Sequence, residues 1–230
     1  ADMKQSGEKD YHMISHGFIP AEQEKIAALA ELDIIQGVVF RVDGEISPWS
    51  AAREVSALCR RLRIKASLHI RMTLGKPGEV QSDDDWVANR VAEALSAAAA
   101  FGDLHLYPDT FADVDRGYFR RHGVVDRFYN PHPAFHVVRH LNAVLATGFS
   151  DGADGVLTPG EVDNPIMLFA ENRRQYRLIS GDCLFEDDGS EAKTETIDLI
   201  SGEHVEGIQS TDGIVVPSHP AALFLRISDA

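Results

Sequence analysis

The sequence predicts an α/β fold with a parallel sheet, followed by a smaller antiparallel β domain. Short β-forming runs alternate with amphipathic helical patterns over residues 1–148. A linker-like stretch at 149–154 follows, and beyond it short strand-like runs are separated by turn signals. The chain has 230 residues, 44% of them hydrophobic and 25% charged, so it is long enough to bury a core in each part.

The first part contains four expected strands, each followed by a helix. The strands are expected at 11–18, 34–42, 66–72 and 104–109, and the helices at 20–32, 48–63, 86–100 and 130–148. Ser47-Pro48 is typical of an N-cap followed by proline, and the aspartates after Ser82 favour the start of the third helix. Strands joined by such helices pair in parallel through right-handed crossovers. Four units of this kind fit a small doubly wound sheet and half of an eight-stranded barrel equally well.

The second part, residues 155–230, is expected to form a small antiparallel β-sandwich. Its strands are expected at 166–170, 175–180, 194–199 and 222–227. Turn signals such as Ser201-Gly202 and Asp212-Gly213 separate them.

Ionisable side chains recur on one face of the successive strands in the first part. Residues two apart on a strand share a face. The sets that share a face are Arg41 with Asp43, His69 with Arg71, and His105 with Tyr107 and Asp109. A parallel strand covered on both sides is expected to be almost entirely apolar. The pattern therefore indicates either a functional pocket at the carboxyl ends of the strands or a structural ion-pair network, such as Arg41 with Asp43 or Arg71 with Asp109.

The loop after the fourth expected strand places carboxylates near the mouth of such a pocket. These are Asp109, Asp113 and Asp115. Two carboxylates across a sugar can serve as acid and as base or nucleophile, although an acidic loop can also bind a hard cation or only be solvated. Trp49, Trp86 and Phe111 could line a sugar platform, but tryptophans at helix starts are more often packing residues.

Composition excludes several classes of protein. The net charge of −14 argues against a broad nucleic-acid surface, and no run of about 18 apolar residues is present to span a membrane. Cys59 and Cys183 are far apart and have no metal-ligand spacing, so we expect two reduced thiols in a cytoplasmic protein without a secretory signal. Dinucleotide, nucleotide-triphosphate and serine-hydrolase motifs are missing from the sequence, and neither a cofactor nor a metal is predicted.

Several phrases of the sequence resemble the last β/α unit of (β/α)8-barrel glycoside hydrolases. They are the strand that ends at Asp109, the run Asp115-Arg116-Gly117-Tyr118-Phe119, the phrase Asn130-Pro131-His132-Pro133-Ala134 and the helix that follows it. The phrase at 214–223 is similar to the end of the β domain that often follows such barrels. The resemblance implies that residues 1–148 are strands five to eight of a barrel, that 149–154 is a linker, and that 155–230 is a β-sandwich domain.

The resemblance implies a glycoside-hydrolase-like enzyme that acts on a carbohydrate, with Arg41 and Arg71 gripping an anionic group. Asp109 is the predicted catalytic carboxylate, oriented by His69 and His105. The predicted substrate-binding residues are Arg41, Asp43, Arg71, Tyr107, Asp113 and Asp115. The chain departs from the family at strand 66–72, which would be the seventh, because it carries His69 and Arg71 where the retaining enzymes have a glutamate nucleophile.

Two other functions remain open, and one partner is expected. A metal-dependent barrel enzyme would use His12, His16, Asp43 or His69, although the spacing of the first two is more typical of hydrogen-bonding histidines. A catalytically inactive carbohydrate-binding or assembly subunit is the other alternative. Because half of a barrel leaves two sheet edges and a polar interior open, we expect an N-terminal half-barrel as a separate or cleaved chain.

Overall fold

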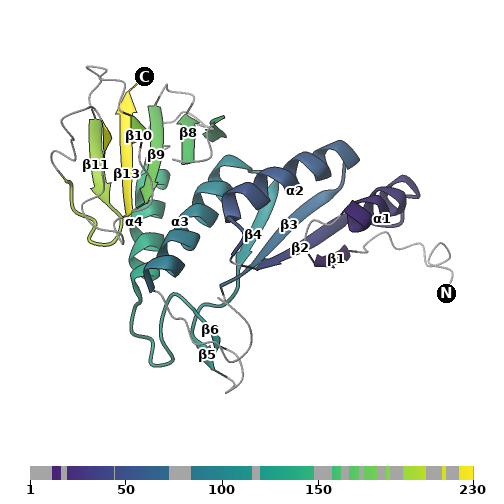
Figure 1. The fold of residues 1–230 in the computed structure, drawn as a ribbon, viewed down its shortest axis with the longest axis horizontal. Coiled ribbons are helices and arrows are strands. Elements are labelled where there is room, and N and C mark those ends of the chain that lie inside the picture. Colours follow the sequence, from purple (N-terminus) through teal and green to yellow (C-terminus); the bar gives the residue numbers. More distant parts are fainter. Residues whose placement is uncertain are drawn as a thin grey trace.

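The computed structural model contains an α/β part and a β-sheet part that lies beside it (Figure 1). The described residues are 12–16, 20–43, 45–72, 84–115, 120–147, 157–161, 166–170, 174–180, 185–186, 194–205, 214–215 and 223–229. The predicted linker at 149–154, Ser82 and the second thiol, Cys183, lie outside them.

The first part alternates strands and helices as predicted. Its elements are β1 (His12–His16), α1 (Pro20–Glu31), β2 (Gly37–Asp43), α2 (Pro48–Leu62), β3 (Lys65–Arg71), α3 (Asp84–Ala100) and β4 (Leu104–Pro108). The Ser47 hydroxyl oxygen caps α2 by accepting the backbone N–H of Ser50 at 3.3 Å, and Pro48 occupies the first turn. α3 begins with Asp84 and Asp85, whose charges are favourable at the positive end of a helix.

The four strands form one parallel sheet in the order β1-β2-β3-β4. Right-handed crossovers between strands in this order place all the connecting helices on the same face. In Figure 1, α1 and α2 lie along one side of the strands. A doubly wound sheet needs helices on both faces, and the strand order of the described residues does not provide them. The order fits half of a barrel, and the other half stays a prediction.

Burial alternates along the two central strands of this sheet. The side chains that face the helices are almost inaccessible to solvent; they are Val38, Phe40, Val42, Ala66, Leu68 and Ile70. The residues between them, including Arg41 and His69, remain partly accessible. The predicted division into an apolar face and a polar face is therefore confirmed for β2 and β3.

A long loop connects β4 to α4 (Pro133–Thr147) and contains the short pair β5 (Val114–Asp115) and β6 (Arg120–Arg121). α4 packs against α3. The helix begins at Pro133 and not at the predicted Asn130, because Asn130 belongs to a turn with Asp126 and Pro131 forms a β-bridge with Val125.

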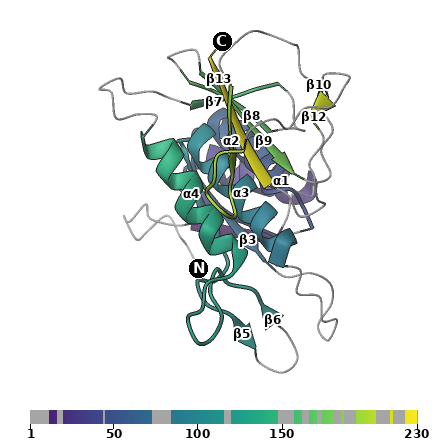
Figure 2. The ribbon, with the colours of Figure 1, turned by 90° about the vertical axis from the view of Figure 1, so that its left-hand side faces the viewer.

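The second part is antiparallel, as predicted. β7 (Leu157–Pro159), β8 (Ile166–Ala170), β9 (Arg174–Ser180), β11 (Thr194–Asp198) and β13 (Leu223–Asp229) form a five-stranded sheet in the order β11-β13-β9-β8-β7. β10 (Phe185–Glu186) and β12 (Ile214–Val215) form a separate pair. The five-stranded sheet packs on α3 through β7, β8 and β9, and Figure 2 shows it above α3 and α4. The described strands include this one large sheet, and the second layer of a sandwich stays a prediction.

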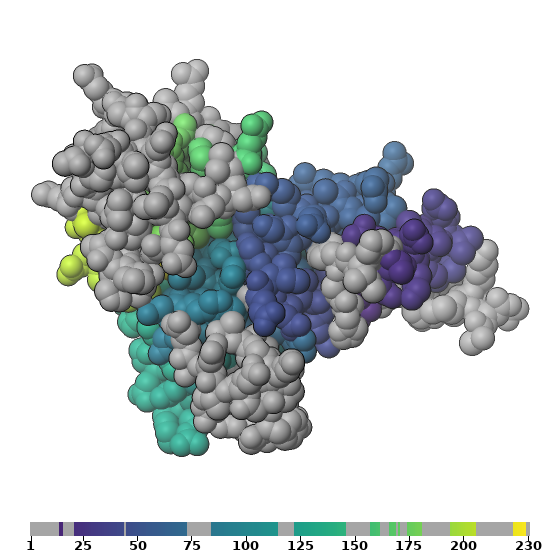
Figure 3. Space-filling model, in the orientation of Figure 1, coloured from purple at the N-terminus to yellow at the C-terminus, as the bar shows by residue number. Residues whose placement is uncertain are grey.

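The two parts share one hydrophobic core. Ile166 and Leu178 of the five-stranded sheet belong to the same buried cluster as Val87 and Val91 of α3. The space-filling view shows the blue and teal residues between the purple N-terminal residues on one side and the green and yellow C-terminal residues on the other (Figure 3). No helix in the described part of the chain is long and apolar enough to cross a bilayer.

Candidate functional site

The accessible face of the parallel sheet carries polar side chains in rows across the strands. Arg41 pairs with His69 in the register of the sheet, and His69 pairs with Tyr107, so these residues form one row. Asp43 pairs with Arg71 one step nearer to the carboxyl ends of the strands. Sites in parallel α/β proteins gather at these ends, because loops from neighbouring strands meet there.

Hydrogen bonds join Arg41, His69 and Asp109 into a chain. Arg41 Nε donates to His69 Nδ1 at 3.2 Å, and His69 Nε2 lies 3.3 Å from Asp109 Oδ1. A guanidinium group can only donate, so Nδ1 must accept and the hydrogen of the neutral imidazole is on Nε2. Nε2 then donates to the Asp109 carboxylate. The three side chains come from β2, from β3 and from the residue that follows β4, so three neighbouring strands fix the orientation of one imidazole.

Burial separates the roles of the three side chains. The side chain of Asp109 is only 1% exposed, whereas that of His69 is 20% exposed. A ligand on this face therefore reaches the imidazole before it reaches the carboxylate. In this arrangement Asp109 fixes the ring of His69, and the cationic Arg41 and the imidazole are the groups that the face presents.

The next row contains an ion pair. The Arg71 guanidinium pairs with the Asp43 carboxylate, and their side chains are 39% and 52% exposed. On the outer strand β4, His105 and Tyr107 are exposed. Around the fixed imidazole, the face therefore presents two arginines and an exposed phenol, groups that can hydrogen-bond to the hydroxyl or carboxylate groups of a ligand.

Asp113 lies in the loop after β4 and contacts the residues that shape the loop. Its Oδ1 accepts the backbone N–H of Gly123 at 2.8 Å, and its Oδ2 lies 3.0 Å from His132 Nε2. A Cβ at Gly123 would lie 2.5 Å from the Phe111 carbonyl oxygen, so only glycine fits there. Both carboxylate oxygens of Asp113 thus contact other residues of the loop, and the role of Asp113 in substrate binding stays a prediction. The side chain of Asp115 lies outside the described residues.

Of the aromatic residues that the sequence suggested for a sugar platform, one is exposed to solvent and another is buried. Trp49 is 1% exposed and packs on Phe101 with 5.4 Å between ring centroids, so it is a core residue. Phe111 is 62% exposed. Sequence analysis missed two further exposed aromatic residues in the same loop, Phe128 and Tyr129, and the signal that could have found them is the surrounding turn from Asp126 to Asn130.

Metal-ligating groups do not converge in the described part of the chain. It contains no cluster of three or more His, Cys, Asp or Glu residues arranged to hold a metal ion. His12 and His16 lie at the two ends of β1, and their side chains lie outside the described residues.

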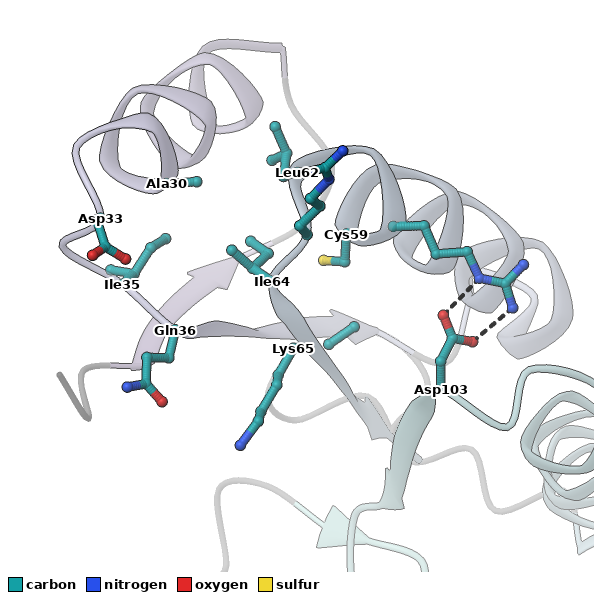
Figure 4. Close-up of a pocket in the computed structure, with 12 residues that line it drawn as sticks. Ala30, Asp33, Ile35, Gln36, Cys59, Leu62, Ile64, Lys65 and Asp103 are labelled. Carbon is teal, nitrogen blue, oxygen red and sulfur yellow. Dashed lines mark hydrogen bonds and ion pairs between the residues drawn. The ribbon is translucent and has the colours of Figure 1, made fainter.

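A separate cavity of about 710 Å³ lies at the opposite, amino ends of the strands (Figure 4). It is lined by the ends of α1 and α2 and by the start of β3. Arg60 donates two hydrogen bonds to Asp103 at 2.7 and 2.9 Å, and this hydrogen bonding lowers the pKa of the Asp103 carboxyl group. Burial raises the pKa of the Cys59 thiol to about 11, so this cysteine is an unreactive core residue.

Comparisons with solved structures give similarities of fold at low sequence identity. A GH39 beta-xylosidase from Caulobacter crescentus matches 94% of this chain with 10% identity and a TM-score of 0.44. A glucosidase from Croceicoccus marinus matches 93% with 14% identity and a TM-score of 0.45. A calcium-binding mutant of Bacteroides uniformis beta-glucuronidase 2 matches 91% with 9% identity and a TM-score of 0.41. The chain spans 56%, 58% and 24% of the length of these three proteins, respectively.

Comparisons at the level of sequence give no match. Neither a protein-family model nor a curated protein matches the chain.

Proposed function

We propose that this chain is a glycoside-hydrolase-like protein that acts on a carbohydrate at the polar face of its parallel sheet. The observation that carries the proposal is the hydrogen-bonded chain Arg41–His69–Asp109 at the carboxyl ends of three neighbouring strands. Holding a buried carboxylate and an imidazole in one orientation costs free energy that ordinary packing would avoid. The sequence of the loop after β4 resembles that of glycoside hydrolases, and this resemblance indicates that the substrate is a carbohydrate.

Each side chain of the site has a proposed role. Asp109 fixes His69, and because both ring nitrogens of His69 are bonded, the imidazole holds the Arg41 guanidinium in place and contacts the substrate only through its ring carbon atoms. Arg41 and Arg71 bind an anionic or strongly polar group of the sugar, and His105 and Tyr107 bind its hydroxyl groups. Asp43 is the more exposed carboxylate of the face, and it is released for substrate contact when Arg71 turns to the ligand.

A further β/α half-barrel is part of the proposal. Among the described residues β1 pairs only with β2, and β4 pairs only with β3, so both edges of the parallel sheet present unpaired backbone groups. A second β/α half, carried by a separate or cleaved chain, would pair with both edges and supply a carboxylate opposite His69 and Asp43. Native mass spectrometry of the protein from its source tests this: we expect a complex larger than 25.3 kDa. A stable monomer of that mass would contradict the half-barrel.

Replacement of Asp109 tests the site itself. Asp109→Asn keeps the shape of the side chain but removes the negative charge that accepts from His69 Nε2. We expect kcat/KM on hydrolysed aryl glycosides to fall at least about a hundredfold, because the imidazole loses its fixed orientation and no longer positions Arg41 for the substrate. The matched control is Asp33→Asn, on an exposed carboxylate beyond α1, and it should leave turnover unchanged. Full turnover by Asp109→Asn would show that Asp109 is not part of a catalytic site.

The burial of Asp109 favours one alternative, a carbohydrate-binding subunit without catalysis. A carboxylate that is 1% exposed does not reach a glycosidic bond directly. Binding of gluco- or xylo-oligosaccharides that depends on Arg41 and His69, with no release of reducing ends, would identify this alternative.

A further inference from the structure

A rigid turn in the loop after β4 holds two large aromatic side chains in solvent. Asp126 Oδ1 accepts the backbone N–H groups of Phe128 and Asn130 at 2.7 and 2.8 Å, and Asp126 Oδ2 accepts from Asn130 Nδ2 at 2.7 Å. The backbone closes the same turn, because Tyr129 N donates to Asp126 O and Asp126 N donates to Asn130 O. The hydrogen bond from the Asn130 side chain lowers the pKa of Asp126, so the carboxylate stays ionised and the turn stays closed at neutral pH.

The turn exposes its aromatic residues at a conformational cost. Phe128 is 69% exposed and Tyr129 is 74% exposed. Tyr129 has a φ of 66°, a left-handed conformation that is rare for a bulky residue. A strained backbone and two largely solvated aromatic rings both cost free energy, and among the described residues the Arg127 guanidinium offsets part of this cost at Phe128. Such strain is typical of a surface that contacts a ligand.

The turn is continuous with the candidate site. Phe111 follows Asp109 by two residues, so their Cα atoms lie within about 7 Å. The Phe111 carbonyl oxygen accepts the backbone N–H groups of Val124 and Val125 at 2.9 and 3.1 Å, and the turn begins at the next residue, Asp126. Phe111 is itself 62% exposed. The loop therefore presents aromatic side chains from the position beside Asp109 outward to Tyr129.

The charge of the chain and the chemistry of the exposed aromatic residues indicate which class of ligand binds to this loop. The net charge of −14 disfavours nucleic acids and anionic membranes, both of which bind exposed aromatic residues only with the help of clustered cations. Arg127 already covers one face of Phe128, with its guanidinium carbon 4.8 Å from the ring centroid. Flat rings separated by polar groups match the alternating C–H and hydroxyl faces of a neutral sugar chain, in which the C–H faces stack on aromatic rings.

We propose that Phe111, Phe128 and Tyr129 form an extended stacking subsite for the further sugar units of an oligosaccharide or polysaccharide whose first unit occupies the polar face. This inference rests on the proposed function for the identity of the first-unit site, and it deepens that function from a carbohydrate to a polymeric carbohydrate. The subsite predicts that affinity rises with the length of the sugar chain, because each added unit meets a preformed ring.

The experiment measures dissociation constants of the full chain for gluco- and xylo-oligosaccharides of one to six units by titration calorimetry. For the wild type we expect affinity for the hexamer to exceed that for the monomer by at least about tenfold. The double variant Phe128→Ala/Tyr129→Ala should bind the hexamer about tenfold more weakly than the wild type and the monomer equally well. The control is Leu32→Ala, which removes a similarly exposed apolar side chain beyond α1 and should change neither constant.

Each other outcome overturns the proposal. The proposed subsite would be contradicted if the wild type and the double variant bound the hexamer with affinities that agree within twofold. It would also be contradicted if the wild type bound no oligosaccharide of the panel. A double variant with a lower melting temperature or a smaller native mass would assign the aromatic residues to a protein interface. Failure of the proposed function gives a different result: Asp109→Asn then has no effect on turnover, while length-dependent binding and its loss in the double variant persist.

Discussion

At the scale of single residues, Arg41 controls the tautomer of His69. Lysine has no Nε–H in a fixed plane, so Arg41→Lys should let the imidazole exchange tautomers and lose its hydrogen bond to Asp109. We expect kcat/KM to fall by about tenfold or more, while the melting temperature stays within a few degrees. The matched control, Arg63→Lys, changes an exposed arginine at the far end of α2. An unchanged kcat/KM would assign Arg41 to the fold alone.

Asp103 gives a pH-dependent prediction at the same scale. Its hydrogen bonds from Arg60 lower its pKa in the folded protein, so its ionised form stabilises the fold above the unfolded pKa of about 3.9 and this contribution disappears as pH falls through the lower folded value. The pair is exposed to solvent, so Asp103→Asn should cost only about 0.5–1 kcal/mol at pH 7. Urea midpoints at pH 7 and at pH about 2.5 measure this, and a difference that persists undiminished at acid pH would contradict it.

At the scale of elements, α2 ends in a conformation that suits glycine better than the residue present. Arg63 follows the last turn with a φ of 56° and donates its backbone N–H to the carbonyl groups of Arg60 and Cys59. Arg63→Gly removes the Cβ conflict of the left-handed region and should raise the free energy of unfolding by about 0.5–1 kcal/mol. Arg61→Gly, within the last helical turn, should lower it by about 1 kcal/mol. Denaturant midpoints of the two variants must therefore move in opposite directions from that of the wild type.

The elements also mark what sequence patterns can and cannot predict. Strict alternation predicted that Arg41 shares a polar face with Asp43, and His69 with Arg71, because period-two burial is a local property. The same pattern gave no register, so it could not show that His69 bridges Arg41 and Asp109. The strand order β11-β13-β9 was equally out of reach, because β13 comes last in the chain and inserts between earlier strands. The contact of Asp113 with His132 was also out of reach, because the two residues lie 19 apart across a loop without periodicity.

At the scale of the whole molecule, the C-terminal sheet supports the helices that lie on the covered side of the parallel sheet. Arg53 of α2 donates to the Gly160 carbonyl oxygen beyond β7 at 3.1 Å. The side chain of Ser47 donates to Glu93 at 2.6 Å, and both line a cavity of about 270 Å³ with Leu178 and Leu223 of the five-stranded sheet. The helices thus pack between two sheets, one on each side. Because these contacts lie on the side of the helices away from the parallel sheet, the five-stranded sheet does not cover the polar face in the described part of the chain.

This arrangement predicts that the two parts of the chain unfold together. Leu178 is 5% exposed and belongs to the core that includes α3. Leu178→Ala should lower the free energy of unfolding by about 2–4 kcal/mol through the cavity that it leaves. Both tryptophans, Trp49 and Trp86, lie in the first part, so their fluorescence reports the half that does not carry the substitution. We expect the fluorescence transition in urea to move to lower concentration together with the far-ultraviolet circular dichroism transition. If Leu178→Ala left the fluorescence midpoint where the wild type has it, the two parts would be independent folding units.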